Sequence, residues 1–177
     1  MTLSRIPPDA LDPTSVPVFE VRHLAITHPS AEPLLRELAD EYGTRYGPLA
    51  GEEMRRFPAH EFDPPDGAFL LVFEDGEAVA GGAFRRYDAD TAELKRIWTH
   101  SAHRRRGLAR RVLDELERTA HERGYAKVTL TTGPRQPEAK ALYLATGYTA
   151  LPDIEETGSD GAKFHLLAFE KSLTGAA

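Results

Sequence analysis

The chain has 177 residues, enough for one well-buried domain, and its 41% hydrophobic and 28% charged residues are ordinary for a globular protein. Its formal net charge of −6 argues against a dedicated nucleic-acid binder, because that class usually has a strongly basic domain. The chain has no cysteine, so it can form neither a disulfide nor a thiolate metal site. No apolar run approaches the ~20 residues that span a bilayer, and the N-terminus has no signal-peptide profile. We therefore expect a cytoplasmic protein without a membrane partner.

The first segments of the chain predict an arm, a strand and a helix. Residues 1–17 carry four prolines and little apolar content, so we expect a flexible arm ahead of a single domain over residues 18–177. The alternating stretch 18–24 predicts the first strand. Residues 30–46 have apolar residues at helical spacing and predict an amphipathic helix. The next segment suggests a short helix that ends near Pro58.

A hairpin and a third strand follow. Two apolar runs within residues 68–87 flank an Asp-Gly pair, which is a strong hairpin signal. Residues 91–100 predict the next strand, but its alternation slips, because Leu94 and Ile97 fall on opposite parities. One extra residue, a β-bulge, would explain the slip. An edge or twisted strand that tolerates mixed faces would explain it as well.

The second half of the chain predicts, in order, a helix over 107–123, a buried strand over 126–132, a helix from Pro137 to Gly147, and two last strands around an acidic loop at 152–161. The strand–helix–strand unit in this order should form a parallel, right-handed crossover. The expected fold class is therefore α+β (mixed α/β). We expect a central mixed, mostly antiparallel sheet flanked by helices.

The stretch RRRGLARRVL, residues 104–113, packs five arginines around Gly107, between a strand ending near Thr99 and a helix beginning at about Leu108. A helix start presents unpaired N–H groups and a positive dipole end, which bind phosphate, and glycine lets the backbone approach the ligand. The missing Lys-Ser/Thr ending excludes a P-loop, and the missing further glycines exclude the dinucleotide fingerprint. These residues alone leave open a pyrophosphate site and a solvated basic turn.

Two motifs in this part of the chain resemble those of the GNAT family of acetyl-CoA-dependent N-acetyltransferases. The family loop Gln/Arg-x-x-Gly-x-Gly/Ala is matched by Arg104, Gly107 and Ala109. The family element Asn-x-x-Ala-x-x-Leu-Tyr-x-x-x-Gly-Tyr/Phe is matched at five positions, namely Ala139, Leu142, Tyr143, Gly147 and Tyr148. The resemblance covers residues 18–171. It implies a GNAT-type fold, acetyl-CoA as co-substrate and an amine as acceptor.

Carried onto this sequence, the resemblance implies a cofactor site made mostly of backbone. Backbone groups of Ile97, Trp98 and Thr99 would pair with the pantetheine arm like an added strand. The loop that holds the pyrophosphate would begin at Arg104 and offer the N–H groups of Arg105, Arg106, Gly107, Leu108, Ala109 and Arg110. Tyr143 would lie near the thioester sulfur. The sequence departs from the family at Gln136, where an asparagine commonly contacts the cofactor.

Acetyl transfer to an amine needs a proton acceptor, donors for the oxyanion and help for the leaving thiolate. An alkyl ammonium with a pKa of ~10.4 must lose a proton, and a thiolate whose thiol has a pKa of ~8.5 leaves more easily when a phenol protonates it. We assign Tyr143 as this acid, with a core tyrosine as the alternative. A backbone N–H of residues 97–99 is the candidate oxyanion donor. Glu93 is either the base, directly or through water, or a solvated strand glutamate.

His100 and His103 have the spacing of a metal-binding pair, but they lie in the phosphate loop without a carboxylate motif, so we expect no metal. The expected function is acetyl transfer from acetyl-CoA to a primary amine, with a small molecule as acceptor. The alternatives are acetylation of a protein N-terminus or lysine, a non-catalytic acyl-CoA sensor, and a nucleic-acid binder. The intact Tyr143 argues against the sensor, and the net charge argues against nucleic acid. A homodimer is left open.

Overall fold

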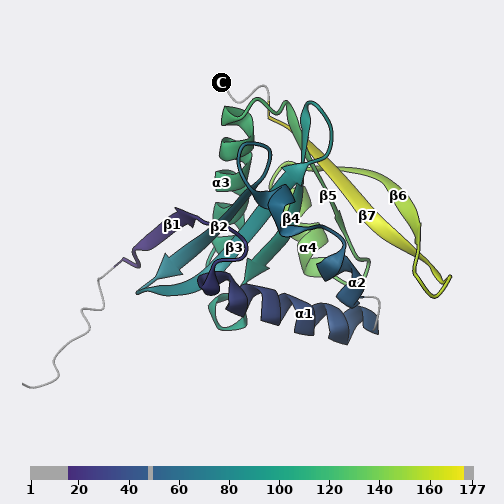
Figure 1. Ribbon diagram of the computed structural model, residues 1–177, viewed down its shortest axis with the longest axis horizontal. Coiled ribbons are helices and arrows are strands. Elements are labelled where there is room, and N and C mark those ends of the chain that lie inside the picture. Colours follow the sequence, from purple (N-terminus) through teal and green to yellow (C-terminus); the bar gives the residue numbers. More distant parts are fainter. Residues whose placement is uncertain (1–15, 48–49, 174–177) are drawn as a thin grey trace, which may run out of the picture.

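The computed structural model describes residues 16–47 and 50–173, so nearly all of the arm expected at residues 1–17 lies outside the described residues. Seven strands form one sheet in the order β1-β2-β3-β4-β5-β7-β6 (Figure 1). The strands are β1 (Phe19–His23), β2 (Ala68–Glu74), β3 (Glu77–Arg86), β4 (Thr91–Thr99), β5 (Lys127–Thr132), β6 (Thr149–Thr157) and β7 (Lys163–Ser172). Strands β4 and β5 run parallel and the other paired strands run antiparallel, which confirms the mixed, mostly antiparallel sheet.

Helices cover both faces of this sheet (Figure 1). The helices are α1 (Glu32–Tyr46), α2 (Ala50–Arg55), α3 (Leu108–Glu122) and α4 (Pro137–Ala145), with single 3₁₀ turns at Pro29–Ala31, Ala59–Phe62 and Ser101–His103. Leu34 and Leu38 of α1 are buried in one apolar cluster with Trp98 of β4. A second cluster joins α3 and α4 to the sheet. The core therefore lies in two layers, one on each side of the sheet.

Helix α3 follows the period that its sequence predicts. Val112, Leu113, Leu116 and Ala120 are fully buried, and Gly124 has a φ of 92° just after the helix ends. A left-handed residue there is the usual helix stop, which glycine adopts without a Cβ penalty. The hairpin is also confirmed, because Asp75 and Gly76 both have positive φ (50° and 82°), as a two-residue type I′ turn requires.

The slip in the alternation of β4 is a β-bulge. Gly81 of β3 pairs with Trp98 and Ala83 pairs with Lys95, so two residues of β4, Arg96 and Ile97, face the single residue between them. Arg96 has a φ of 60°, a conformation that non-glycine residues rarely adopt. Of the two explanations left open by the sequence, the bulge is correct. It turns the residues that follow toward the middle of the sheet.

Strands β4 and β5 separate soon after they begin. Their parallel pairing covers only Thr91–Glu93 against Lys127–Thr129. Beyond it, β4 continues along β3 as far as Thr99, and β5 continues along β7 as far as Thr132. The two strands thus leave an opening in the sheet, with the backbone of β4 along one side of it.

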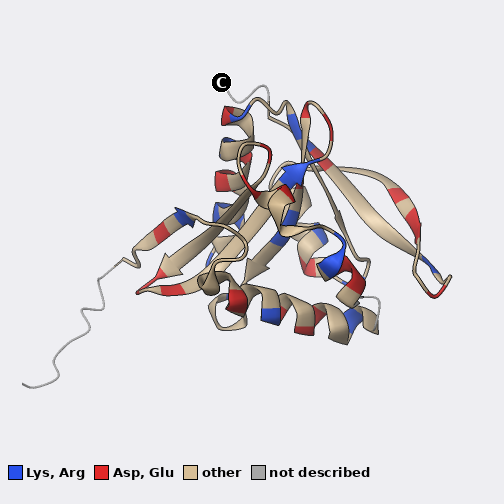
Figure 2. Ribbon diagram, in the orientation of Figure 1, with Lys and Arg blue, Asp and Glu red and all other residues tan. Residues whose placement is uncertain are grey.

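The prediction of an acidic loop over residues 152–161 is wrong for most of that range. Strand β6 extends through residue 157, and only a short turn joins it to β7. The charges belong to an edge strand that is largely exposed, where carboxylates stay in water (Figure 2). The register shift between Leu151 and Ile154 places Pro152 in an irregularity, where its missing N–H disturbs the ladder least. From the sequence alone, the acidic residues of this segment predict a loop.

Candidate active site

A cavity of about 1570 Å³ occupies the opening between β4 and β5. Its walls come from α1, α2, β4, the start of α3, the loop from β5 to α4, and the β6–β7 hairpin. It brings together nearly all the site residues expected from the sequence, namely Glu93, Ile97, Trp98, Thr99, Arg104, Arg105, Gly107, Leu108, Ala109, Arg110, Gln136 and Tyr143. Residues that are 50 positions apart in the chain therefore line one space.

Arg106 is the exception among the expected residues. Its guanidinium donates hydrogen bonds of 2.6 and 2.7 Å to the two carboxylate oxygens of Glu74. This pairing holds the pKa of Glu74 below its ordinary value. The guanidinium also lies over the ring of Phe19, 5.3 Å from its centroid. Because the side chain is turned away from the cavity, Arg106 has only its backbone N–H to offer a ligand there.

The loop before α3 has the geometry of an anion site. Gly107 is the N-cap residue with a φ of 74°, and Arg105 has a φ of 63°. A Cβ built at Gly107 would meet no protein atom within 4 Å, so the backbone conformation, and not crowding, favours glycine here. Arg105 and Arg110 line the cavity and have no ion-pair partner among the described residues. Free positive charge and the first N–H groups of α3 therefore meet at one end of the cavity.

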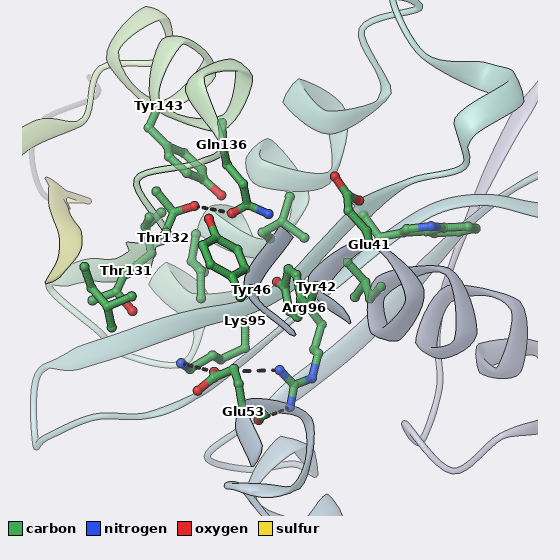
Figure 3. A pocket seen from close by; sticks show the side chains of 18 of the residues that line it. Glu41, Tyr42, Tyr46, Glu53, Lys95, Arg96, Thr131, Thr132, Gln136 and Tyr143 are labelled. Atoms are coloured by element: carbon green, nitrogen blue, oxygen red, sulfur yellow. Dashed lines mark hydrogen bonds and ion pairs between the residues drawn. The ribbon is translucent and has the colours of Figure 1, made fainter. Parts of the chain in front are cut away.

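Tyr143 points from α4 into the cavity beside Gln136 (Figure 3). Its ring is held by Tyr148 and Phe169, each with a centroid 5.5 Å away. Burial raises the pKa of its phenol, so the hydroxyl keeps its proton. Within the described part of the chain no group hydrogen-bonds this hydroxyl, which leaves it available to a ligand. Tyr143 thus lines the cavity, and its place beside the thioester sulfur stays a prediction.

Gln136 lies at the N-terminus of α4, where it can replace the asparagine of the family motif. Thr132 Oγ1 donates a 2.6 Å hydrogen bond to Gln136 Oε1 (Figure 3). This contact fixes the amide and leaves its NH₂ group free to donate into the cavity. The longer side chain thus has a partner in β5 that orients it.

Helix α1 closes one side of the cavity against the loop that follows β5. Arg45 donates to the carbonyl of Arg135 and Arg135 donates to the carbonyl of Arg45, each at 2.8 Å. The backbone N–H of Arg135 also donates to the hydroxyl of Tyr46 at 3.2 Å. That hydroxyl fills the space where a Cβ at Gly133 would lie. The sequence analysis missed this contact, because nothing local links residues 45 and 135.

Glu93 is 8% exposed in the cavity wall, so it is not the solvated strand glutamate considered from the sequence. Arg85 Nη1 donates to its carboxylate at 2.6 Å, and Lys95 Nζ lies 3.3 Å from the other oxygen. Lys95 also donates to Glu53 of α2 at 2.9 Å (Figure 3). A chain of alternating charges thus runs from β3 through β4 to α2.

Arg96 connects the bulge to α2. Its side chain is buried, and its guanidinium donates to the carbonyl oxygens of Glu53 and Met54 at 3.1 and 3.2 Å. These carbonyls belong to the last turn of α2, where, among the described residues, the only other donor to them is the N–H of Arg56, 3.4 Å from the Glu53 oxygen. The residue with the unusual φ therefore fixes the helix that carries Glu53. A positive φ at an arginine leaves no signal in the sequence.

The two histidines of the phosphate loop have structural contacts. His100 Nδ1 accepts a 3.0 Å hydrogen bond from the N–H of Ala102 and caps the 3₁₀ turn, while His103 Nδ1 lies 3.5 Å from Glu74. Across residues 16–47 and 50–173, no group of three or more histidines and carboxylates is placed to hold a metal ion. In the same ranges no helix is long and apolar enough to cross a bilayer.

The sequence profile of the acetyltransferase (GNAT) family matches residues 32–148, which include the loop before α3, β5 and α4. The chain belongs to the GNAT family. It is 30% identical over 98 residues to the uncharacterized N-acetyltransferase YsnE of Bacillus subtilis (strain 168). That match covers 54% of this chain and 65% of YsnE.

Solved structures share the fold of this GNAT chain. YncA of Salmonella typhimurium, solved with its cofactor acetyl-CoA, has a TM-score of 0.62 at 16% identity, covering 90% of this chain and 96% of its own. The PaiA N-acetyltransferase of Thermoplasma acidophilum, solved in complex with coenzyme A, has a TM-score of 0.66 at 16% identity, covering 88% and 99%. At these identities the likeness shows the GNAT fold, and the expected fold is confirmed.

Proposed function

We propose that the protein transfers an acetyl group from acetyl-CoA to the primary amine of a small molecule. The observation that supports this most directly is the single cavity that joins an anion site at α3, a free backbone edge on β4 and the unpartnered hydroxyl of Tyr143. In acetyl-CoA, the pyrophosphate would bind at the anion site, the pantetheine arm along the edge of β4, and the thioester beside the hydroxyl of Tyr143. The acceptor then enters from the side lined by α2 and the β6–β7 hairpin.

In this proposal the cofactor is bound mainly by backbone. N–H groups of residues 105–110 bind the pyrophosphate, with Arg105 and Arg110 adding charge. The backbone of Ile97, Trp98 and Thr99 binds the pantetheine arm, and a backbone N–H of this segment donates to the oxyanion. The indole of Trp98 lies in the core beneath α1, so Trp98 contributes its backbone. Gln136 donates its amide NH₂ to the cofactor.

Tyr143 stabilises the leaving thiolate by donating a hydrogen bond. An ordinary phenol, with a pKa of ~10, is already a weaker acid than a thiol with a pKa of ~8.5, and burial raises the pKa of Tyr143 further. Full proton transfer from Tyr143 is therefore uphill, whereas a hydrogen bond needs no matched pKa. The thiolate takes its proton later from water or from the carboxyl group of Glu93, which has accepted the proton of the amine.

Glu93 accepts the proton of the attacking amine, directly or through water. Arg85 and Lys95 orient this carboxylate, while its remaining lone pairs face the cavity. The N–C bond forms as the amine attacks the thioester carbon, and the C–S bond breaks as the tetrahedral intermediate collapses. The products are an acetamide and coenzyme A.

A CoA-release assay with a panel of amines tests this function. The panel includes small amines, amino acids, polyamines and short peptides, each with acetyl-CoA at saturating concentration. Release of thiol that depends on a small amine, with the acetamide identified by mass spectrometry, is the expected result. Turnover with peptides alone would replace the small-molecule acceptor by a protein acceptor. Tight acetyl-CoA binding without turnover on any amine would instead support a sensor.

A further inference from the structure

The charges at the acceptor end of the cavity carry information about the acceptor itself. We propose that the acceptor is an amine that also bears a carboxylate, and that Arg56 binds this carboxylate. The inference rests on the proposed acetyl transfer and names the substrate class for the same site. It depends on how the ionic groups that line this end are already paired.

The carboxylates beside the expected base are neutralised by the protein. Glu93 is paired with Arg85 and Lys95, and Glu53 is paired with Lys95 at 2.9 Å and lies 3.9 Å from Arg96. The side chains of Lys95 and Glu93 are only 9% and 11% exposed, so water screens this pair little. The Lys95 ammonium thus already occupies the place between two carboxylates that a cationic substrate would need.

An acceptor that offers only positive charge gains little at this end. Glu52, which also lines it, is exposed and accepts a hydrogen bond from Ser159 Oγ. A carboxylate in water contributes little to ion pairing. A polyamine would therefore meet an inner wall that carries no net negative charge from Glu53 and Glu93. Its ammonium groups would lose water at this inner wall, where both carboxylates are already paired with cations of the protein.

Arg56 has a long and exposed ion pair at this end. Its Nη1 lies 3.4 Å from both carboxylate oxygens of Glu156, whereas Arg85 donates to Glu93 at 2.6 Å and Lys95 donates to Glu53 at 2.9 Å. Charge-assisted bonds normally fall at about 2.7–2.9 Å. Half of the Arg56 side chain is exposed, compared with 28% for Glu156. A ligand carboxylate can therefore displace Glu156 and form the two parallel hydrogen bonds that a guanidinium favours.

The position of Arg56 suits a small bifunctional acceptor. Arg56 follows α2, and Glu156 lies on β6, so the pair spans the cavity between two separate walls. The rings of Phe57 and Phe164 line the same end and offer apolar surface to the body of the acceptor. With its carboxylate on Arg56, such a molecule directs its amine inward toward Glu93 and the thioester.

Matched amine pairs test the inference. Each amino acid in the panel is compared with its carboxamide, which keeps size and amine but removes the negative charge. We expect kcat/KM to be at least about tenfold higher for the acids, and polyamines to be poor acceptors. The amine of each carboxamide is less basic than the amine of the matching acid, so it loses its proton more easily. This difference favours the amides, so it would reduce an observed preference for the acids. Equal rates for acids and amides, or polyamines as the best acceptors, would overturn the inference and leave the acetyl transfer intact.

Three variants separate a binding role of Arg56 from a structural one. Arg56→Gln should abolish the preference for acids, while Glu156→Gln should raise kcat/KM for acids several-fold, because it removes the competing carboxylate. If the ion pair were purely structural, both variants would lower kcat/KM for the acids by similar amounts. Arg55→Gln is the matched control, since Arg55 is the last residue of α2, next to Arg56, and does not line the cavity. Retained acid preference in Arg56→Gln would also overturn the proposal. Acetyl-CoA affinity, measured separately for each variant, should not change.

Discussion

The hydroxyl of Tyr148 donates a 2.8 Å hydrogen bond to the carboxylate of Glu117, which is buried on the inner side of α3. Lys171 of β7 donates to the other oxygen of the same carboxylate at 2.7 Å. The ring of Tyr143 packs against Tyr148. One buried carboxylate thus connects α3, the end of α4 and β7 directly behind the proposed hydrogen-bond donor.

Lys171→Met should destabilise the fold, because it leaves Glu117 buried with a neutral partner only. Removing one member of a buried ion pair costs roughly 3–5 kcal/mol, and the partial exposure of Lys171 lowers our expectation to about 2 kcal/mol. The free energy of unfolding in urea measures it. Lys163→Met is the control, since the Lys163–Glu155 pair is exposed and its loss should change stability by less than about 0.5 kcal/mol. Equal effects of the two variants would contradict the prediction.

Stability should fall at alkaline pH because of three buried tyrosines. Burial raises the pKa of Tyr42 to about 12, and raises the pKa values of Tyr143 and Tyr148 as well, the latter with help from the Glu117 carboxylate. The folded state therefore favours their protonated forms, so their contribution is complete below the unfolded pKa of ~10 and is lost as the pH rises above it. Each tyrosine then lowers the free energy of unfolding by about 1.4 kcal/mol per pH unit. Unfolding measured between pH 8 and 11 should show this slope, and Tyr148→Phe should make it shallower.

The cofactor end of the site could be predicted because its signals are local. Gly107 precedes an amphipathic helix, Tyr143 lies within a motif of thirteen residues, and the alternation of β4 slips where the bulge occurs. The acceptor end could not be predicted. Glu53, Arg85 and Lys95 come from three separate elements, and the local sequence around each of them predicts only a charged surface residue. The extent of β6 was missed because an edge strand keeps its charges in water and has no buried period to detect.

Gly107→Glu should abolish acetyl-CoA binding while the protein stays folded. The substitution places a carboxylate where the pyrophosphate is expected, and the open space around Gly107 accommodates the side chain itself. Gly107→Gln is the matched control, because it carries the same strain at a φ of 74° without the charge. Titration calorimetry with acetyl-CoA measures the affinity of both variants, and circular dichroism checks that they are folded. Unchanged affinity in Gly107→Glu would remove this loop from the cofactor site.

Glu93→Gln should slow acetyl transfer most at low pH. The amide keeps the shape of the side chain, and Arg85 and Lys95 retain Glu61 and Glu53 as partners, so the fold should persist. Without the base, the rate depends on the fraction of acceptor that is already neutral, which rises toward the amine pKa of ~10.4. We expect a loss of ~10²-fold near pH 7 that shrinks as the pH rises. A uniform loss at every pH would indicate that Glu93 positions the acceptor and does not accept its proton.

Tyr143→Phe should lower the rate of the chemical step with little effect on binding or stability. The phenylalanine keeps the ring contacts with Tyr148 and Phe169, and the lost hydroxyl has no hydrogen-bond partner among the described residues. Acetyl-CoA affinity and the melting temperature should therefore stay near the wild-type values. The single-turnover rate should fall by ~10²-fold, the effect expected when one hydrogen-bond donor to a developing negative charge is removed. Some activity should remain, because a thiolate with a conjugate acid of pKa ~8.5 is a fair leaving group without help.

Single-turnover measurements are needed, since slow product release would hide the loss in steady-state turnover. Tyr148→Phe provides the control, as it removes a hydroxyl that is bonded to Glu117 and should reduce stability more than rate. A wild-type single-turnover rate in Tyr143→Phe would show that the departing thiolate needs no hydrogen bond from Tyr143.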